Sequence, residues 1–198
     1  MKSTVRTFVA VEIDEVIRRA AADLVDELRA VSSEVGWVAA QNMHLTVKFL
    51  GDVAAETNPQ VCQAVAEAVA DVEIFELEIR GVGAFPNAAR PRTLWLGSGA
   101  GEEQLAALAE RVEKALRPLG FPREGRPFRG HLTLGRVRRP GPGLAALAPM
   151  LRQRAALDVG RSRIHEVVVF SSDLQRGGPV YEALARCPLA PKGLNDEY

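Results

Sequence analysis

Two short stretches of the chain each place a threonine two positions after a histidine. The first reads His-Leu-Thr-Val at residues 44–47, and the second reads His-Leu-Thr-Leu at residues 131–134. Residues i and i+2 of a β-strand share a face, so each histidine would stand beside its threonine with the aliphatic residues behind them. The chain holds three histidines, and two of them carry this pattern. The alternative is that two unrelated histidines occupy core strands.

Such a pair of motifs could cleave a phosphodiester without a metal. A histidine has an ordinary pKa near 6.5, so of two histidines one can accept a proton while the other donates one. His44 and His131 are the candidates for these roles. The hydroxyls of Thr46 and Thr133 could bind the phosphate oxygens that do not take part in bond breaking.

An arginine could neutralise the charge that grows as phosphorus is attacked, and Arg136 is the candidate. In a regular strand it would point away from His131, because five positions separate the two. Gly135 lies between them, and glycine is the usual residue of a β-bulge that shifts the alternation by one. We therefore predict a bulge or a strand end at Gly135.

Arginines concentrate around the second motif. Residues 117–139 contain seven arginines and one acidic residue, although the formal net charge of the chain is zero. The segment favours an anionic substrate, with Arg129 as a second candidate for binding it; the alternative is a pair of solvated loops.

Several other side chains could border the site. Lys48 has the strand parity of His44 and could equally be a solvated lysine. Phe49, Trp95 and Phe128 could stack on a base or pack in the core. The third histidine, His165, has no threonine two positions on and is expected to be a strand or surface residue.

Composition limits the class of protein. The hydrophobic content of 47% supplies a sizeable core, and neutral bulk charge gives no argument for a polyanion partner. Cys62 and Cys187 form no disulfide framework or C-x-x-C pair, which fits a reducing compartment. The N-terminal segment lacks the apolar run of a signal peptide, and no run of about 18 apolar residues occurs. We expect a cytoplasmic protein that does not enter a membrane.

Hydrophobic periodicity predicts an α+β fold with antiparallel strands. Strands are expected at residues 4–13, 36–38, 44–50, 75–80, 93–96 and from 131, with a closing hairpin of residues 164–172 and 180–186. Gly51-Asp52 is expected to end the first histidine strand. Helices are expected at about residues 15–31, 57–69, 102–116 and 144–155. No glycine-rich nucleotide fingerprint is present.

The strings around the two motifs resemble the RNA 2',3'-cyclic phosphodiesterase branch, or 2'-5' RNA ligase-like family, of the two-histidine phosphoesterase superfamily. They occupy residues 8–11, 42–51, 92–97, 128–136 and 178–181, so the match covers nearly the whole chain. The resemblance implies one bilobal α+β domain over residues 1–198. In it, two antiparallel sheets related by a pseudo-two-fold axis would flank a central cleft, with helices on the outside.

The resemblance also implies a reaction and the residues that perform it. A terminal 2',3'-cyclic phosphate of RNA would be hydrolysed to a 2'-phosphate, with no cofactor and no metal. His44 matches the proton donor to the 3' oxygen, His131 the base that activates water, and Arg136 the charge-stabilising arginine. Thr46 and Thr133 match the phosphate-binding hydroxyls.

Two further positions are compared with the family. Tyr181 matches a position near the cleft, although hairpin packing would explain it as well. Gly130 departs from the proline expected before the second histidine.

Two alternatives remain open at the level of sequence. One is a binding module that holds RNA ends bearing a 2'- or cyclic phosphate without turnover. The other is a zinc site, which would need a third ligand besides the two histidines. Whether the protein is the phosphodiesterase or the binding module, its expected partner is RNA with such ends, tRNA fragments among the candidates. We expect a monomer.

Overall fold

The structure is a computed structural model, and it describes residues 3–191 and 193. The first two residues of the segment considered for a signal peptide lie outside this range. The strands are β1 (Thr4–Val11), β2 (Val35–Trp37), β3 (Leu45–Ala54), β4 (Phe75–Phe85), β5 (Thr93–Ser98), β6 (His131–Val137), β7 (Asp158–Ile164), β8 (Glu166–Gln175) and β9 (Gly178–Pro188). The α-helices are α1 (Glu15–Arg29), α2 (Asn58–Val69), α3 (Glu102–Leu116) and α4 (Gly143–Gln153), and short 3-10 turns include Ala40–Asn42.

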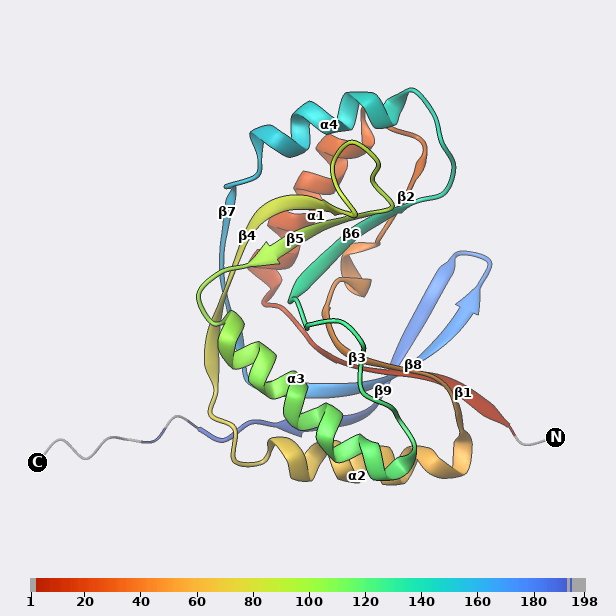
Figure 1. Cartoon of the computed structure of the whole chain (residues 1–198), viewed down its shortest axis with the longest axis vertical. Coiled ribbons are helices and arrows are strands. Elements are labelled where there is room, and N and C mark those ends of the chain that lie inside the picture. The colour runs from red at the N-terminus through yellow and green to blue at the C-terminus, as the bar shows by residue number, and fades with distance from the viewer. Residues whose placement is uncertain (1–2, 192, 194–198) are drawn as a thin grey trace, which may run out of the picture.

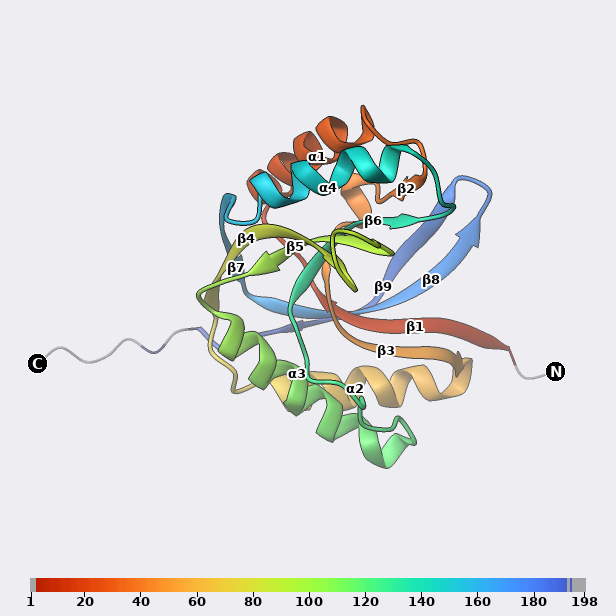
Figure 2. The ribbon, with the colours of Figure 1, turned by 45° about the horizontal axis from the view of Figure 1, so that its top comes forward.

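The strands form one strongly curled antiparallel sheet in the order β7-β4-β5-β6-β3-β1-β8-β9, with β2 paired to β6 (Figure 1). Its two halves meet where β6 lies beside β3, through the register pair Leu45–Leu132. The α+β class and the antiparallel pairing are therefore confirmed, whereas the expected two sheets are joined into one. Figure 2 shows α1 and α4 packed on the half that contains β4 and β6, with α2 and α3 on the half that contains β1 and β3.

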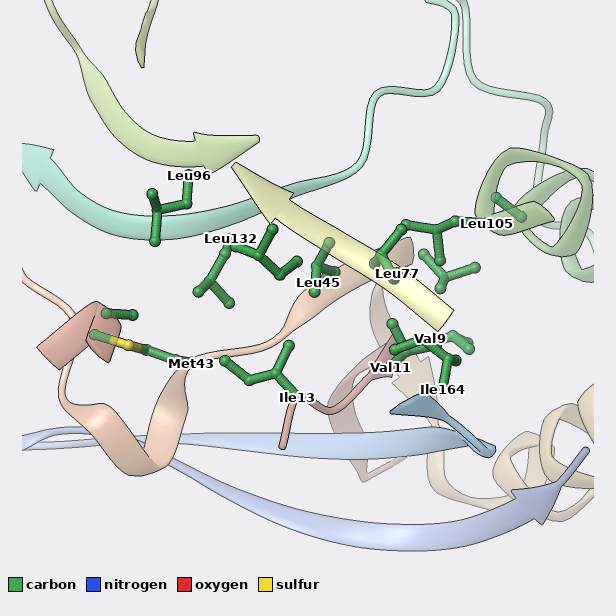
Figure 3. Close-up of a cluster of buried hydrophobic side chains, with 14 of the residues drawn as sticks. Val9, Val11, Ile13, Met43, Leu45, Leu77, Leu96, Leu105, Leu132 and Ile164 are labelled. Atoms are coloured by element: carbon green, nitrogen blue, oxygen red, sulfur yellow. The ribbon is translucent and has the colours of Figure 1, made fainter. Parts of the chain in front are cut away.

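Apolar side chains from both halves of the sheet share one core. Figure 3 shows Val9, Leu45 and Leu132 within a single cluster, and all three are fully buried. Helix α3 begins and ends at the predicted residues and buries the predicted stripe, made of Leu105, Leu108, Ala109, Val112 and Leu116. Burying a leucine stabilises the fold by about 1.5–3 kcal/mol. Leu45 and Leu132 therefore stabilise the junction of β3 and β6, next to the two motifs.

The structure differs from the predicted elements in several places, and β4, for example, continues from the predicted end at Arg80 to Phe85. β3 continues through Gly51 to Ala54, so the predicted end of this strand is wrong. Gly51 has φ +73°, and it permits a local irregularity in the pairing with β1 rather than a stop. Strand β7 is absent from the predicted elements, because its sequence is largely polar and only Ser162 and Ile164 are buried.

The helices also bear on the expected absence of a membrane segment. Among the described residues, no helix is long and apolar enough to cross a bilayer.

Candidate active site

The two His-x-Thr motifs meet at the junction of the two halves of the sheet. Leu45 and Leu132 pair with each other and point into the core, so the residues beside them point to the opposite face. His44, Thr46 and Thr133 line one hollow of about 460 Å³ on this face, and Arg136 lines it as well. His131 lines a second hollow, of about 420 Å³, together with Trp95 and Arg129. The two strands therefore lie side by side and Thr46 and Thr133 share a hollow, whereas His44 and His131 line different hollows, so the meeting of the two imidazoles in one cleft stays a prediction.

Arg136 reaches the site through the predicted bulge in β6. Strand β5 pairs Leu94 with Gly135 and the next residue, Trp95, with Thr133, which leaves Leu134 as the extra residue. The alternation shifts by one, and Arg136 comes to share the face of Thr133. A side chain at Gly135 would collide with β2, because its Cβ would lie 2.6 Å from Val35 Cγ1.

Hydrogen bonds fix the orientation of His44. Its Nδ1 lies 2.9 Å from the Asn42 carbonyl oxygen, and its Nε2 lies 3.1 Å from Thr46 Oγ1. A carbonyl only accepts, so Nδ1 carries the proton, and in the neutral ring Nε2 accepts from the threonine hydroxyl. Asn42 is itself anchored, because its Nδ2 donates to the carbonyl of Pro179 in the β8–β9 hairpin at 2.9 Å.

Aromatic rings enclose His44. Phe8 stacks on the imidazole with ring centroids 4.9 Å apart, and Tyr181 meets it edge-on at 5.4 Å. Burial lowers the pKa of His44 to about 4, against the opposing effect of the Asn42 carbonyl. His44 is therefore neutral at pH 7 when no ligand is bound.

His131 makes the same first contact in different surroundings. Its Nδ1 lies 2.9 Å from the Arg129 carbonyl oxygen, and Phe85 meets the ring at right angles with centroids 5.2 Å apart. His165 repeats the backbone contact at 3.3 Å but is exposed, as expected from sequence. The backbone contact alone therefore does not define the site.

Lys48 does not share the face of His44, and the placement predicted from strand parity is wrong. β1 pairs Val9 with Lys48 and Ala10 with Thr46, so a bulge at Val47 turns Lys48 to the other face. There Lys48 is buried, and its Nζ donates to the Pro122 carbonyl at 2.9 Å and lies 3.3 Å from Glu113 Oε2.

The other candidate side chains divide between the two hollows. Phe49, which is 58% exposed, and Tyr181 line the hollow of His44. Trp95 lies in the hollow of His131, over Gly83 and Gly97, and its indole nitrogen is buried with no hydrogen-bond partner among the described residues. Phe128 packs against the core.

The arginine-rich segment is only partly directed at the site. Arg129 and Arg136 line the two hollows. Arg123, whose side chain is exposed, instead has its Nε 3.4 Å from Oε1 of the half-buried Glu113.

Sequence reasoning named Tyr181 but missed two other aromatic residues that touch the imidazoles, Phe8 and Phe85. Each comes from a different strand, so no local spacing relates it to a histidine. The part of the chain that the structure describes holds no group of three or more His, Cys, Asp or Glu side chains arranged to bind a metal ion.

The fold and the site define a protein in which two His-x-Thr strands meet within a curled antiparallel sheet. The model of the 2'-5' RNA ligase superfamily matches residues 16–176, and the chain belongs to this superfamily. The chain is 35% identical over 179 residues to an RNA 2',3'-cyclic phosphodiesterase of Archaeoglobus fulgidus, in an alignment that covers 90% of this chain and 97% of the relative. The enzyme of the same name from Methanothermobacter thermautotrophicus is 34% identical over 89% of this chain and 95% of its own.

Solved structures share the fold. A protein of Thermus thermophilus superposes with a TM-score of 0.80 and 26% identity, over 95% of this chain and all of its own. Escherichia coli LigT in complex with 3'-AMP superposes with a TM-score of 0.72 and 26% identity, over 94% of this chain and 99% of its own.

Proposed function

We propose that this protein is an RNA 2',3'-cyclic phosphodiesterase, which hydrolyses a terminal 2',3'-cyclic phosphate to a 2'-phosphate without a metal. The observation that carries the proposal is the hollow that combines His44, Thr46, Thr133 and Arg136 from two distant motifs. The names of relatives that match over most of the chain support it.

The proposed reaction uses the two histidines in unequal roles. His131 takes a proton from water as the water oxygen attacks phosphorus, and the bond from phosphorus to the 3' oxygen breaks. His44 gives its proton to that leaving oxygen. Thr46 and Thr133 donate hydrogen bonds to the non-bridging oxygens, and Arg136 neutralises the charge that builds up on them.

His44 must carry a proton to act as the donor, although burial lowers its pKa to about 4 in the free protein. A phosphate anion in the same hollow favours the charged imidazolium, because opposite charges at short distance stabilise each other. Substrate binding would therefore supply the protonated form of His44, and the free enzyme would hold the neutral one.

An assay of defined oligonucleotides ending in a 2',3'-cyclic phosphate tests the proposal, with the 2'- and 3'-phosphate products separated. We expect the 2'-phosphate, a loss of about 10³-fold or more in kcat for H44A and for H131A, and no effect of EDTA. A 3'-phosphate product would reverse the assignment of the leaving oxygen. Tight binding with no product would contradict the proposed enzyme and favour the RNA-end binding module.

We also propose RNA ends with a cyclic or 2'-phosphate as the substrates, tRNA fragments among them. Phe49, Trp95 and Tyr181 are the candidates for stacking on bases, and Arg129 for binding the backbone. In 2'-5' ligation a 5'-hydroxyl would take the place of water: His131 would accept its proton as its oxygen bonds to phosphorus, and His44 would protonate the departing 3' oxygen. A monomer in the cytoplasm is the proposed state, in keeping with two free cysteines.

We propose further that the chain is one bilobal domain whose halves are related by a pseudo-two-fold axis. In support, each half has four strands in the path of the sheet and contributes one His-x-Thr strand at the junction. Superposition of β6-β5-β4-β7 on β3-β1-β8-β9 tests the relation, and a poor fit would reject it.

A further inference from the structure

Two side chains from other elements hold the residue that precedes His131. Glu102, the first residue of α3, accepts a hydrogen bond from the Gly130 N–H through Oε1 at 2.9 Å. Ser98, the last residue of β5, has its hydroxyl oxygen beside Glu102 Oε2 and 3.0 Å from the Gly130 carbonyl oxygen. The N–H and the carbonyl of Gly130 therefore each lie against a side chain. Gly130 itself is buried.

The peptide that Glu102 binds is the one that binds the histidine. The N–H of Gly130 and the carbonyl of Arg129 belong to a single trans peptide unit, whose two polar groups point in opposite directions. One end donates to the Glu102 carboxylate, and the other accepts from His131 Nδ1 at 2.9 Å. A carboxylate on the N–H polarises the peptide and strengthens its carbonyl as an acceptor.

The peptide behind His44 contacts a neutral group instead of a carboxylate. The Nδ1 of His44 donates to the Asn42 carbonyl, and the N–H of that peptide, from Met43, donates to the neutral Ala40 carbonyl at 3.1 Å. The two motifs thus share the contact between the imidazole and the peptide and differ in what lies behind it.

A side chain at position 130 would push Glu102 out of this contact. A Cβ there would lie 2.6 Å from Glu102 Oε2, 2.7 Å from Leu105 Cδ2 and 2.8 Å from Ser98 Oγ. A proline would also lack the N–H that Glu102 accepts. The departure from the expected proline at Gly130 therefore provides the donor to Glu102.

We propose that Glu102 is a positioning residue for His131, acting through the Arg129–Gly130 peptide to keep the imidazole proton on Nδ1 and to leave Nε2 available as the base. The inference rests on the proposed function, in which His131 activates water. It assigns the difference between the two histidines partly to a charge that touches neither substrate nor imidazole.

The kinetic test compares E102A with E102Q and with E103Q as the matched control. Glu103 is exposed on the same helix end, so E103Q removes a charge from the helix terminus alone. We expect E102A to lower kcat about 10- to 100-fold with KM changed less than about threefold. E102Q keeps an oxygen acceptor for the N–H and should recover part of the loss, whereas E103Q should match wild type. Wild-type kcat in folded E102A would overturn the inference.

The second test reads the tautomer in the free protein by ¹⁵N NMR of the imidazoles, with His44 as the internal reference. We expect His131 to be protonated on Nδ1 in the wild type and to shift toward the Nε2–H form in E102A, with His44 unchanged. This readout needs no activity, so it separates a failure of the inference from a failure of the proposed function. An unchanged His131 tautomer in E102A would overturn the inference.

The third test uses the loss of the donor. In a G130P background there is no N–H for Glu102 to accept, so adding E102A should lower kcat no further. An equal fold-loss in both backgrounds would show that Glu102 acts by another route and would overturn the inference. If G130P does not fold, the tautomer measurement decides the question.

Discussion

Among single residues, the two histidines share one contact, from Nδ1 to a backbone carbonyl two positions earlier, and differ in the groups around the ring. The rings of Phe8 and Tyr181 lie against His44, while His131 meets Phe85 and a peptide held by Glu102. Burial lowers the pKa of His44 in the free protein, so the donor role proposed for it depends on the charge of a bound phosphate. The unequal surroundings give the two motifs unequal chemistry, although their sequences are almost the same.

The lowered pKa of His44, about 4, makes stability depend on pH. Between pH 4 and about 6.5 the unfolded chain binds a proton at this residue and the native protein does not, so the free energy of unfolding rises with pH across this window. It is then constant with respect to His44 above about pH 6.5. Urea denaturation at about pH 5 and pH 7 should show a larger difference for wild type than for H44N, by on the order of 1–3 kcal/mol. Equal differences in the two proteins would contradict the lowered pKa.

At the scale of elements, two bulges decide which side chains reach the site. The bulge in β6 brings Arg136 to the face of Thr133, and the bulge in β3 takes Lys48 away from the face of Thr46. The same irregularity places Phe49 on the cleft face opposite Phe8. Alternation along a strand is therefore reliable only up to the first bulge.

The position of Lys48 predicts that its loss affects stability and not catalysis. Its side chain is 3% exposed, and K48M removes one partner of the Glu113 carboxylate, which keeps its contact with Arg123, and the donor to the Pro122 carbonyl. We expect a loss of about 1–3 kcal/mol in the free energy of unfolding, with kcat within about twofold of wild type. R111M, which breaks the exposed pair with Asp71, is the control and should cost less than about 1 kcal/mol. A large fall in kcat for K48M would contradict this prediction and indicate that Lys48 takes part in the active site.

The bulge at Gly135 predicts a position that tolerates no side chain. In G135A the new methyl group would press on Val35 and Trp37 of β2, because its distances to them would be 2.6 and 2.9 Å. We expect a loss of about 1–3 kcal/mol in stability, and a fall in kcat as Arg136 is displaced. A methyl group at Gly125 would meet no atom of the described residues within 4 Å, so G125A is the control, and both measurements should match wild type. Normal kcat and stability in G135A would show that the strand absorbs the methyl group.

The sequence predicts helices that have a periodic apolar stripe and bulges that contain a glycine. It predicts few of the contacts between residues that lie far apart in the chain. Helix α3 is predicted to the residue because its apolar stripe repeats with the helical period. Gly135 predicts the bulge in β6, but the bulge at Val47 has no glycine to mark it. Glu102 reaches Gly130 only after α3 and β6 have packed, and no local pattern contains that contact.

At the scale of the whole molecule, the site is a property of the junction between the two halves. Within the described part of the chain, β3 and β6 pair at Leu45–Leu132, and His44, Thr46, His131 and Thr133 flank these leucines. Any shift of one half against the other changes the separation of His44 and His131, the acid and the base of the proposed mechanism. We therefore expect packing at this junction to affect catalysis as well as stability, because misplacement by about 1 Å can cost about 10²-fold in rate.

This dependence predicts a larger fall in kcat for L132A than for the same change at an equally buried leucine far from the junction. Leu132 is fully buried beneath the motifs, and Leu108 is 1% exposed in α3. Each change to alanine should lower the free energy of unfolding by about 2–5 kcal/mol, since each leaves a cavity. At a temperature where both variants are folded, we expect kcat to fall at least about tenfold for L132A and to stay within about threefold of wild type for L108A. Equal kcat values at matched stability would mean that the two motifs keep their separation without the leucine, and that the strands beside the junction, β1 and β5, are sufficient to hold them.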